Sequence, residues 1–223
     1  MAPINYTIVE MSETEIEDES RRYGALAGSV RALADASLRT TVPADVVAEV
    51  TQQIQLLADR LAAEQIEGSF GVSLTASGTV RGHGNAVVGL RNPAAVPLRV
   101  EKSAEGRAWA DFTLGALHEG PPGMCHGGVA ALLLDQLLGE AAAAGGSPGM
   151  TGTLTLRYVQ NTPLGECSAE AWIERTEGIK TIVRGVLRRA DGETTVEAEG
   201  IFILPRWARA ALAESDRKPP RFE

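Results

Sequence analysis

The chain has 223 residues, of which 44% are hydrophobic and 22% charged, and its formal net charge is −8 at pH 7. This length supports one main core with room for a helical appendage. The acidic balance argues against a general nucleic-acid-binding protein, and no apolar run approaches the roughly 18 residues of a membrane span. Residues 1–10 lack the basic and apolar regions of a signal peptide, so we expect a cytoplasmic protein.

Residues 12–66 are predicted to form two helices. Ser12 and Glu15 make a capping box at the start of the first helix, and Pro43 suits the first turn of the second. Apolar residues recur at helical spacing in both, at Ile16, Tyr23, Leu26, Val30 and Leu33, and at Val46, Val50, Ile54, Leu57 and Leu61. Because each stripe needs a partner surface, we expect a hairpin that packs on the main domain or on another subunit.

Glycine and proline residues are scattered through residues 68–97, which favours loops and marks a boundary. We therefore divide the chain into an N-terminal helical extension with its loop (1–84), a main domain (85–207) and a C-terminal tail (208–223).

Within the main domain the hydrophobic period changes to two, which is typical of strands. The predicted strands are 98–102, 107–114, 151–159, 166–174, 180–188 and 194–204. Glu177-Gly178 and Asp191-Gly192 mark tight hairpin turns. One apolar helix, Gly127–Ala144, interrupts the strands. The pattern predicts an α+β fold in which an antiparallel sheet wraps around that helix.

Asp135 lies inside this helix, where valine, leucine and alanine fill almost every face. Such a helix is expected to be buried, and burying an unpaired carboxylate is costly. Together with the preceding His126 and the two glycines Gly127 and Gly128, the acid indicates an active site. The alternative is an acid that reaches water at the edge of the helix, beside Gln136.

Other candidate groups are weaker. Cys125 and Cys167 make neither a disulfide framework nor a metal set, and Cys125 lacks an orienting partner as a nucleophile. The three histidines (His83, His118 and His126) are too scattered for a metal site, and we expect His83 to be solvated in its glycine-rich loop. We expect no metal and no cofactor.

One segment carries a family resemblance. His118-Glu-Gly-Pro-Pro-Gly-Met-Cys-His126-Gly-Gly, followed by Asp135 nine positions after His126, resembles the hotdog-fold acyl-CoA thioesterases of the PaaI type. The later stretch Met150–Tyr158, with Pro163-Leu164, resembles the strand after the hotdog helix and its turn. The similarity covers roughly residues 90–205. It implies a hotdog fold, hydrolysis of acyl-CoA or a similar pantetheine thioester in lipid metabolism, and a homodimer or homotetramer.

The resemblance also implies roles for single residues. Asp135 matches the catalytic acid, acting as general base or nucleophile, and Gly127 matches the residue whose backbone N–H polarises the thioester carbonyl. His126 matches the residue that shapes this turn, and Thr151 the hydroxyl that places the water or the acid. Gly128 lets a ligand approach the backbone closely.

Two departures from the family concern substrate binding. Many relatives have asparagine six positions before the motif histidine, where this chain has Gly120. Some relatives have basic residues after the strand tyrosine, where this chain has Val159-Gln160-Asn161. Arg157 and Lys180 are the candidates to hold the coenzyme A phosphates instead. A carrier other than coenzyme A is the alternative.

The distance between Gly127 and Asp135 decides how the site is assembled. Asp135 lies eight residues after Gly127, roughly 12 Å along a helix, which is too far to act on a carbonyl held at its own helix start. We therefore expect a symmetric dimer in which Gly127 of one chain meets Asp135 of the other. The alternative function is a non-catalytic acyl-thioester-binding or regulatory hotdog protein. A hotdog hydratase would need an adjacent Asp and His pair, which the sequence lacks.

Overall fold

A six-stranded antiparallel sheet forms the main domain in the computed structural model, which describes residues 7–75, 79–204 and 221–222. Its strands are β4 (Glu101–Ser103), β5 (Arg107–Leu114), β6 (Met150–Tyr158), β7 (Gly165–Glu177), β8 (Lys180–Arg189) and β9 (Thr194–Ile203). They are ordered β4-β5-β7-β8-β9-β6, so β4 and β6 form the two edges. The predicted strands are confirmed, with ends that differ by up to three residues.

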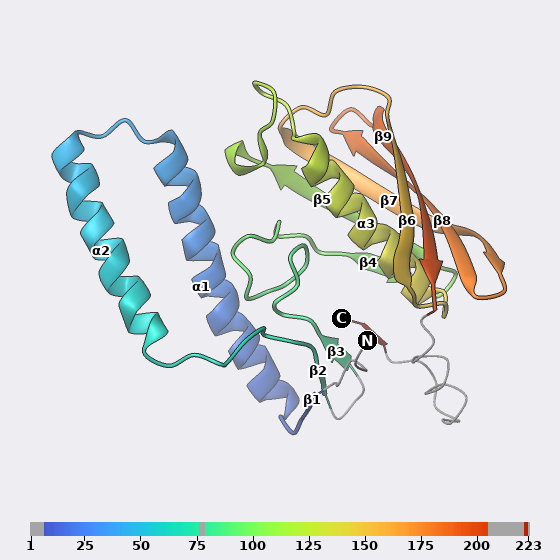
Figure 1. Cartoon of the computed structure of the whole chain (residues 1–223), viewed down its shortest axis with the longest axis horizontal. Helices are drawn as coiled ribbons and strands as arrows, with labels where there is room; N and C mark the ends of the chain where they lie inside the picture. Colours follow the sequence, from blue (N-terminus) through green and yellow to red (C-terminus); the bar gives the residue numbers. More distant parts are fainter. Residues whose placement is uncertain (1–6, 76–78, 205–220, 223) are drawn as a thin grey trace.

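The helix α3 (Gly127–Ala144) lies along the concave face of this sheet (Figure 1). Strand β5 shows which face of the sheet is apolar, because its residues alternate strictly between exposed and buried. The buried residues belong to the hydrophobic core that includes α3: Ala108, Ala110, Phe112 and Leu114. Leu133, Leu134, Leu137 and Leu138 of α3 are almost completely buried against the sheet. The α+β hotdog arrangement expected from the sequence is therefore confirmed.

The prediction that α3 is buried on all sides is wrong for the single chain. Leu132 is 44% exposed, and the flank of α3 beside the edge strand β6 remains accessible. Within the described part of the chain, α3 is the one helix long and apolar enough to cross a membrane. Its packing against the sheet accounts for this composition.

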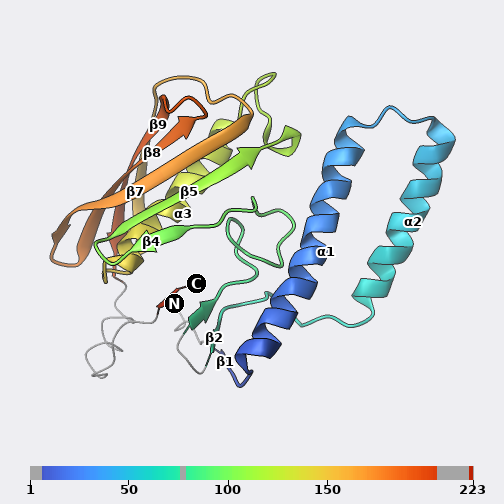
Figure 2. The same ribbon diagram turned by 180° about the vertical axis from the view of Figure 1, so that it is seen from behind.

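The N-terminal helices are α1 (Glu13–Arg39) and α2 (Ala44–Ala62). The capping box is confirmed, since the backbone N–H of Ser12 donates to Oε2 of Glu15 at 2.8 Å and the Ser12 hydroxyl oxygen accepts from the Glu15 N–H at 3.3 Å. Helix α1 lies beside the main domain, whereas α2 is the outermost element (Figures 1 and 2). Only Ala27 of α1 is buried, and α2 has no buried residue. Within the single chain α2 therefore does not pack on the main domain, and packing on another subunit, the other expected arrangement, stays a prediction.

Residues 68–100 contain two short strands, β2 (Ser73–Thr75) and β3 (Thr79–Arg81). They form a second sheet of order β1-β2-β3-β10 with β1 (Thr7–Val9) and β10 (Arg221–Phe222). Apart from residues 221–222, the tail predicted at 208–223 lies outside the described residues. The irregular segment 82–100 is not a free loop, because Val87 and Val96 join the core beside α3.

Candidate active site

The turn before α3 presents an unused backbone amide. His126 is the N-cap residue, and its Nδ1 accepts a 3.0 Å hydrogen bond from the N–H of Gly128. The N–H of His126 donates to the His118 carbonyl at 2.9 Å, which fixes the turn from the other side. Across the described residues, no group accepts a hydrogen bond from the Gly127 N–H. Such an amide at a helix start is suited to bind developing negative charge.

Tyr158 holds Gly127 from the end of β6. Its hydroxyl donates a 2.8 Å hydrogen bond to the Gly127 carbonyl. A Cβ atom at position 127 would lie 3.3 Å from Cε1 and Oη of Tyr158, so the ring leaves little room for any residue but glycine. Sequence reasoning used Tyr158 only as part of a matching strand and missed this contact.

The acid itself lies further along α3. Thr151, on β6, donates a 2.9 Å hydrogen bond from its hydroxyl to Oδ1 of Asp135. The structure thus brings together the two residues for which the resemblance implied a joint role. Asp135 is half-buried in the single chain, so the expectation that it is fully buried is wrong.

The buried acid of α3 is instead Glu140, which is 8% exposed. Its Oε2 accepts from Lys102 Nζ at 3.1 Å, and its Oε1 accepts from Gln136 Nε2 at 2.8 Å. Since Gln136 and Glu140 are four residues apart, they lie on one face of the helix. That spacing is visible in the sequence.

A β-bulge in β6 allows the side chains at both ends of this strand to face α3. Thr151 and Tyr158 are seven residues apart, and in a regular strand they would face opposite sides of the sheet. The register between β6 and β9 shifts between Thr151 and Thr153, which reverses the alternation and turns both side chains toward α3. Such a shift is not readable from the alternating pattern of the sequence.

The two functional ends of α3 remain apart within one chain. Gly127 and Asp135 are separated by eight residues of continuous helix, or about 12 Å. Gly127 lies beside Tyr158 at one end of β6, and Asp135 lies beside Thr151 at the other. One chain therefore offers an acid and an unused amide at separate places along the same edge strand.

A cavity of about 850 Å³ adjoins the acid. Asp135 and Thr151 line it together with Gln136, Glu140 and Asn85. It extends from Asp135 toward the C-terminal end of α3, below the segment 82–100. Sequence reasoning missed Asn85, because nothing in a glycine-rich loop shows which residues reach the helix.

His83 also lines this cavity, and the expectation that it is solvated is wrong. It is 7% exposed, and its ring stacks on Phe70 with centroids 6.1 Å apart. Burial and the neighbouring charge of Arg81 lower the pKa of His83, which favours the neutral ring.

The residues predicted to contact substrate phosphates lie elsewhere. Arg157 pairs with Glu197 at 3.2 Å, and Lys180 begins β8 at the hairpin with β7. In the sheet they lie opposite Glu197 and Ile203 of β9, six residues or about 20 Å apart along the strand. Neither lines the cavity beside Asp135. The Gly128 amide is occupied by His126.

The absence of the asparagine at position 120 is explained by packing. A Cβ atom at Gly120 would lie 2.7 Å from Cα of His126, so the asparagine of many relatives does not fit this turn.

The two cysteines are buried. Burial raises the pKa of the Cys125 thiol and raises the pKa of Cys167 to about 11. Both thiols are therefore protonated near pH 7 and are poor nucleophiles.

Comparison with known proteins identifies the family of this chain. The sequence model of the thioesterase superfamily matches residues 122–196, which include the turn, α3 and β6. An acyl-coenzyme A thioesterase, THEM4 from Xenopus laevis, is 35% identical over 103 residues. That match covers 45% of this chain and 46% of the relative, so it spans about half the length of that protein.

Solved structures extend the similarity to the N-terminal part. A crystal structure described as a thioesterase superfamily protein is 32% identical, with a TM-score of 0.73, and the match covers 81% of this chain and 90% of that one. The PaaI protein of the phenylacetic acid degradation operon of E. coli is 17% identical over 49% of this chain and 80% of that one, with a TM-score of 0.47. On the family model and the 32% identical structure, this chain belongs to the thioesterase superfamily.

Proposed function

We propose that this protein hydrolyses thioesters, with acyl-CoA or a related pantetheine thioester as substrate. The observation that carries the proposal is the hydrogen bond between Thr151 and Asp135 at the wall of a cavity large enough for a substrate chain. A half-buried carboxylate whose orientation is fixed is suited to act on water or on a carbonyl.

The chemistry needs an acid and an anion-binding amide. As general base, Asp135 takes a proton from water while the hydroxide attacks the thioester carbonyl. The Gly127 N–H then stabilises the oxyanion. When the intermediate collapses, the carbon–sulfur bond breaks, Asp135 returns its proton to the leaving thiolate, and the free acid remains. As nucleophile, the Asp135 carboxylate would instead attack the carbonyl carbon and form an anhydride as the carbon–sulfur bond breaks and the thiolate leaves and is protonated by water. A second water then hydrolyses the anhydride to the free acid and the Asp135 carboxylate.

We further propose that two chains share each site. Strand β6 is an edge strand whose outer side pairs with no other strand among the described residues, and Met150 and Tyr158 at its ends and the following Val159 are exposed. Unpaired edges of this length favour pairing with another strand. Two β6 strands paired about a twofold axis would run antiparallel.

The same pairing of β6 strands would bring the acid of one chain to the unused amide of the other. If Thr151 of one chain lies opposite Tyr158 of the other, Asp135 of each chain comes next to Gly127 of the partner subunit. The contacts at the two ends of β6 support this register. A symmetric dimer then contains two equivalent sites.

Thiol release from a panel of short, long and aromatic acyl-CoAs tests the activity. We expect wild type to hydrolyse at least one of them and Asp135→Asn to reduce kcat by about 10²- to 10⁴-fold. Asp111→Asn, which changes an exposed acid on β5, is the matched control and should keep full activity. Equal activity in Asp135→Asn would contradict the mechanism. Binding without hydrolysis by wild type would instead favour the non-catalytic acyl-thioester-binding protein.

A further inference from the structure

The cavity beside Asp135 has walls of two different kinds. Apolar side chains, among them Val88, Leu90, Val96, Leu98, Val100 and Phe202, form one part of it, and the arginines Arg31, Arg81 and Arg99 lie on the side of α1, β3 and the segment 82–100. The face of α3 next to Asp135 is polar instead, and Asn85 continues this polar surface onto the loop above. An apolar chain filling the cavity would leave the unused donors and acceptors of this strip without a partner on the ligand side.

The polar strip is a connected hydrogen-bond chain. Asn85 Nδ2 donates to Gln136 Oε1 at 3.2 Å, and Gln136 Nε2 donates to Glu140 Oε1 at 2.8 Å. Lys102 Nζ closes the chain at Glu140 Oε2, 3.1 Å away. Burying such a charged pair contributes little to stability, because desolvation offsets the attraction. Glu140 lines the cavity, so a functional role of the pair there is the interpretation that we follow.

The strip still has capacity for a ligand. Each carboxamide carries two N–H donors, and the contacts above use one from Asn85 and one from Gln136. The Glu140 carboxylate can accept about four hydrogen bonds and receives two from the described residues. Donors and acceptors are thus both present within five residues of Asp135, about 7.5 Å along the helix.

The N-terminal extension holds Asn85 in place. Arg31 Nη1 of α1 donates to the Asn92 carbonyl at 3.2 Å, and Asn92 Nδ2 donates to the Asn85 carbonyl at 3.2 Å. The Asn85 side chain also accepts from the N–H of Val87 at 2.7 Å and of Val88 at 3.0 Å. The position of Asn85 is therefore fixed from both sides before any ligand arrives.

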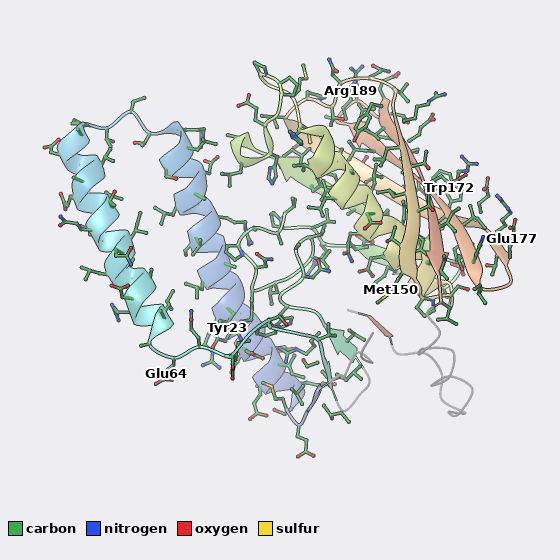
Figure 3. All side chains as sticks on the ribbon, viewed as in Figure 1. Tyr23, Glu64, Met150, Trp172, Glu177 and Arg189 are labelled. Carbon is green, nitrogen blue, oxygen red and sulfur yellow. The ribbon has the colours of Figure 1, made fainter. Side chains whose placement is uncertain are left out.

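A second anchor ties the same loop to α1. Glu19 pairs with Arg81 at 2.6 Å and with Arg91 at 3.2 Å. The Arg91 guanidinium lies 3.3 Å above the ring of Tyr23, which Figure 3 labels on α1. Helix α1 thus forms part of the support of the cavity wall, although it lies outside the family-matched residues 122–196.

We infer that Asn85, Gln136 and Glu140 form a polar subsite that binds an amide or hydroxyl group on the substrate, within about 8 Å of Asp135 along α3. This inference rests on the proposed thioester substrate. The group is carried either by the pantetheine arm on the thiol side or by a hydroxylated acyl chain. An amide and a hydroxyl group each carry a hydrogen-bond donor and an acceptor, and the polar strip has both an acceptor and donors to pair with them.

Binding of uncleavable analogues tests the subsite without relying on catalysis. The ligands are S-(2-oxoalkyl) thioethers, in which a methylene between sulfur and carbonyl prevents hydrolysis. Four are compared by calorimetry: a plain and a hydroxylated tail, each on coenzyme A and on a simple alkanethiol without amides. The variants are Gln136→Met, which keeps the side-chain size, and Asn85→Asp, which keeps the acceptor for Val87 and Val88 but removes the donor to Gln136. Gln53→Met on exposed α2 is the matched control.

We expect both variants to raise Kd about five- to tenfold for ligands that carry the recognised group, and less than twofold for the plain tail on the alkanethiol. A loss confined to coenzyme A ligands assigns the subsite to the thiol arm, and one confined to hydroxylated tails assigns it to the acyl chain. Equal changes for all four ligands, or no change, would overturn the inference. Selective binding by a wild type that cleaves no thioester would retain the subsite and refute only the hydrolase.

Discussion

Thr151 donates its hydroxyl hydrogen to Oδ1 of Asp135 across 2.9 Å, and this bond joins the edge strand of the sheet to the central helix. Strand β6 contributes the hydroxyl and α3 the acid, so the orientation of the carboxylate depends on how the helix sits in the sheet. The same strand holds Gly127 through Tyr158 at its other end.

Removing the hydroxyl should impair catalysis more than folding. Thr151→Val keeps the shape and loses the hydrogen bond to the carboxylate. A bond to a charged group is worth about 1.5–3 kcal/mol, so kcat should fall about 10- to 100-fold. Steady-state kinetics with the best acyl-CoA measures this. Thr151→Ser should restore most of the rate, and Thr153→Val, on an exposed position of β6, should change little. A Thr151→Val enzyme as active as wild type would remove the hydroxyl from the mechanism.

A methyl group at position 127 should block the amide. In Gly127→Ala the new Cβ would press on the Tyr158 ring at 3.3 Å and stand next to the unused N–H. Loss of one such donor typically lowers kcat by about 10²- to 10³-fold. Gly28→Ala, where a Cβ meets no atom within 4 Å, is the control for a glycine-to-alanine change in a helix. Unchanged kcat in Gly127→Ala, with an unchanged thermal midpoint, would show that the oxyanion is bound elsewhere.

Mixing two inactive variants should restore activity if the site is shared. A mixed dimer of Asp135→Asn and Gly127→Ala chains would contain one site with both changes and one site with neither. Random refolding of equal amounts gives half mixed dimers, so about one quarter of wild-type activity should return. The thiol-release assay before and after co-refolding measures this recovery. Activity that stays at the sum of the separate variants would mean that each chain works alone.

Acid should weaken the anchor between α1 and the cavity loop. Burial raises the pKa of Glu19, but the hydrogen bond and charge of Arg81 outweigh it, so the net pKa lies below the ordinary value of 4.5. A lowered folded-state pKa stabilises the fold above pH 4.5, and this contribution is lost as the pH falls through the folded-state value. Thermal midpoints measured from pH 6 to pH 3 should fall less steeply for Glu19→Gln than for wild type. Glu17→Gln, at an exposed position of α1, should follow wild type. Parallel curves for wild type and Glu19→Gln would contradict the role of the pair.

Much of the fold followed from local patterns. The period-two strands, the Ser12 capping box and the apolar helix at 127–144 were all predictable, because side-chain alternation and helix capping depend on residues close in sequence. The surface against which α2 packs was not predictable from the sequence. An amphipathic stripe shows that a helix has an apolar face, but it does not show what covers that face.

The candidate site also has features that the sequence determined and features that only the tertiary structure decided. The sequence by itself determined the acid at 135, the glycine at 127 and the roughly 12 Å between them, because a helix fixes that rise. Only the tertiary structure decided that Asp135 is half-buried while Glu140 is the buried acid, and that Asn85 reaches α3 from a loop 51 residues away. Burial and long-range hydrogen bonds depend on which surfaces meet when the chain packs, and neighbouring residues do not encode that choice.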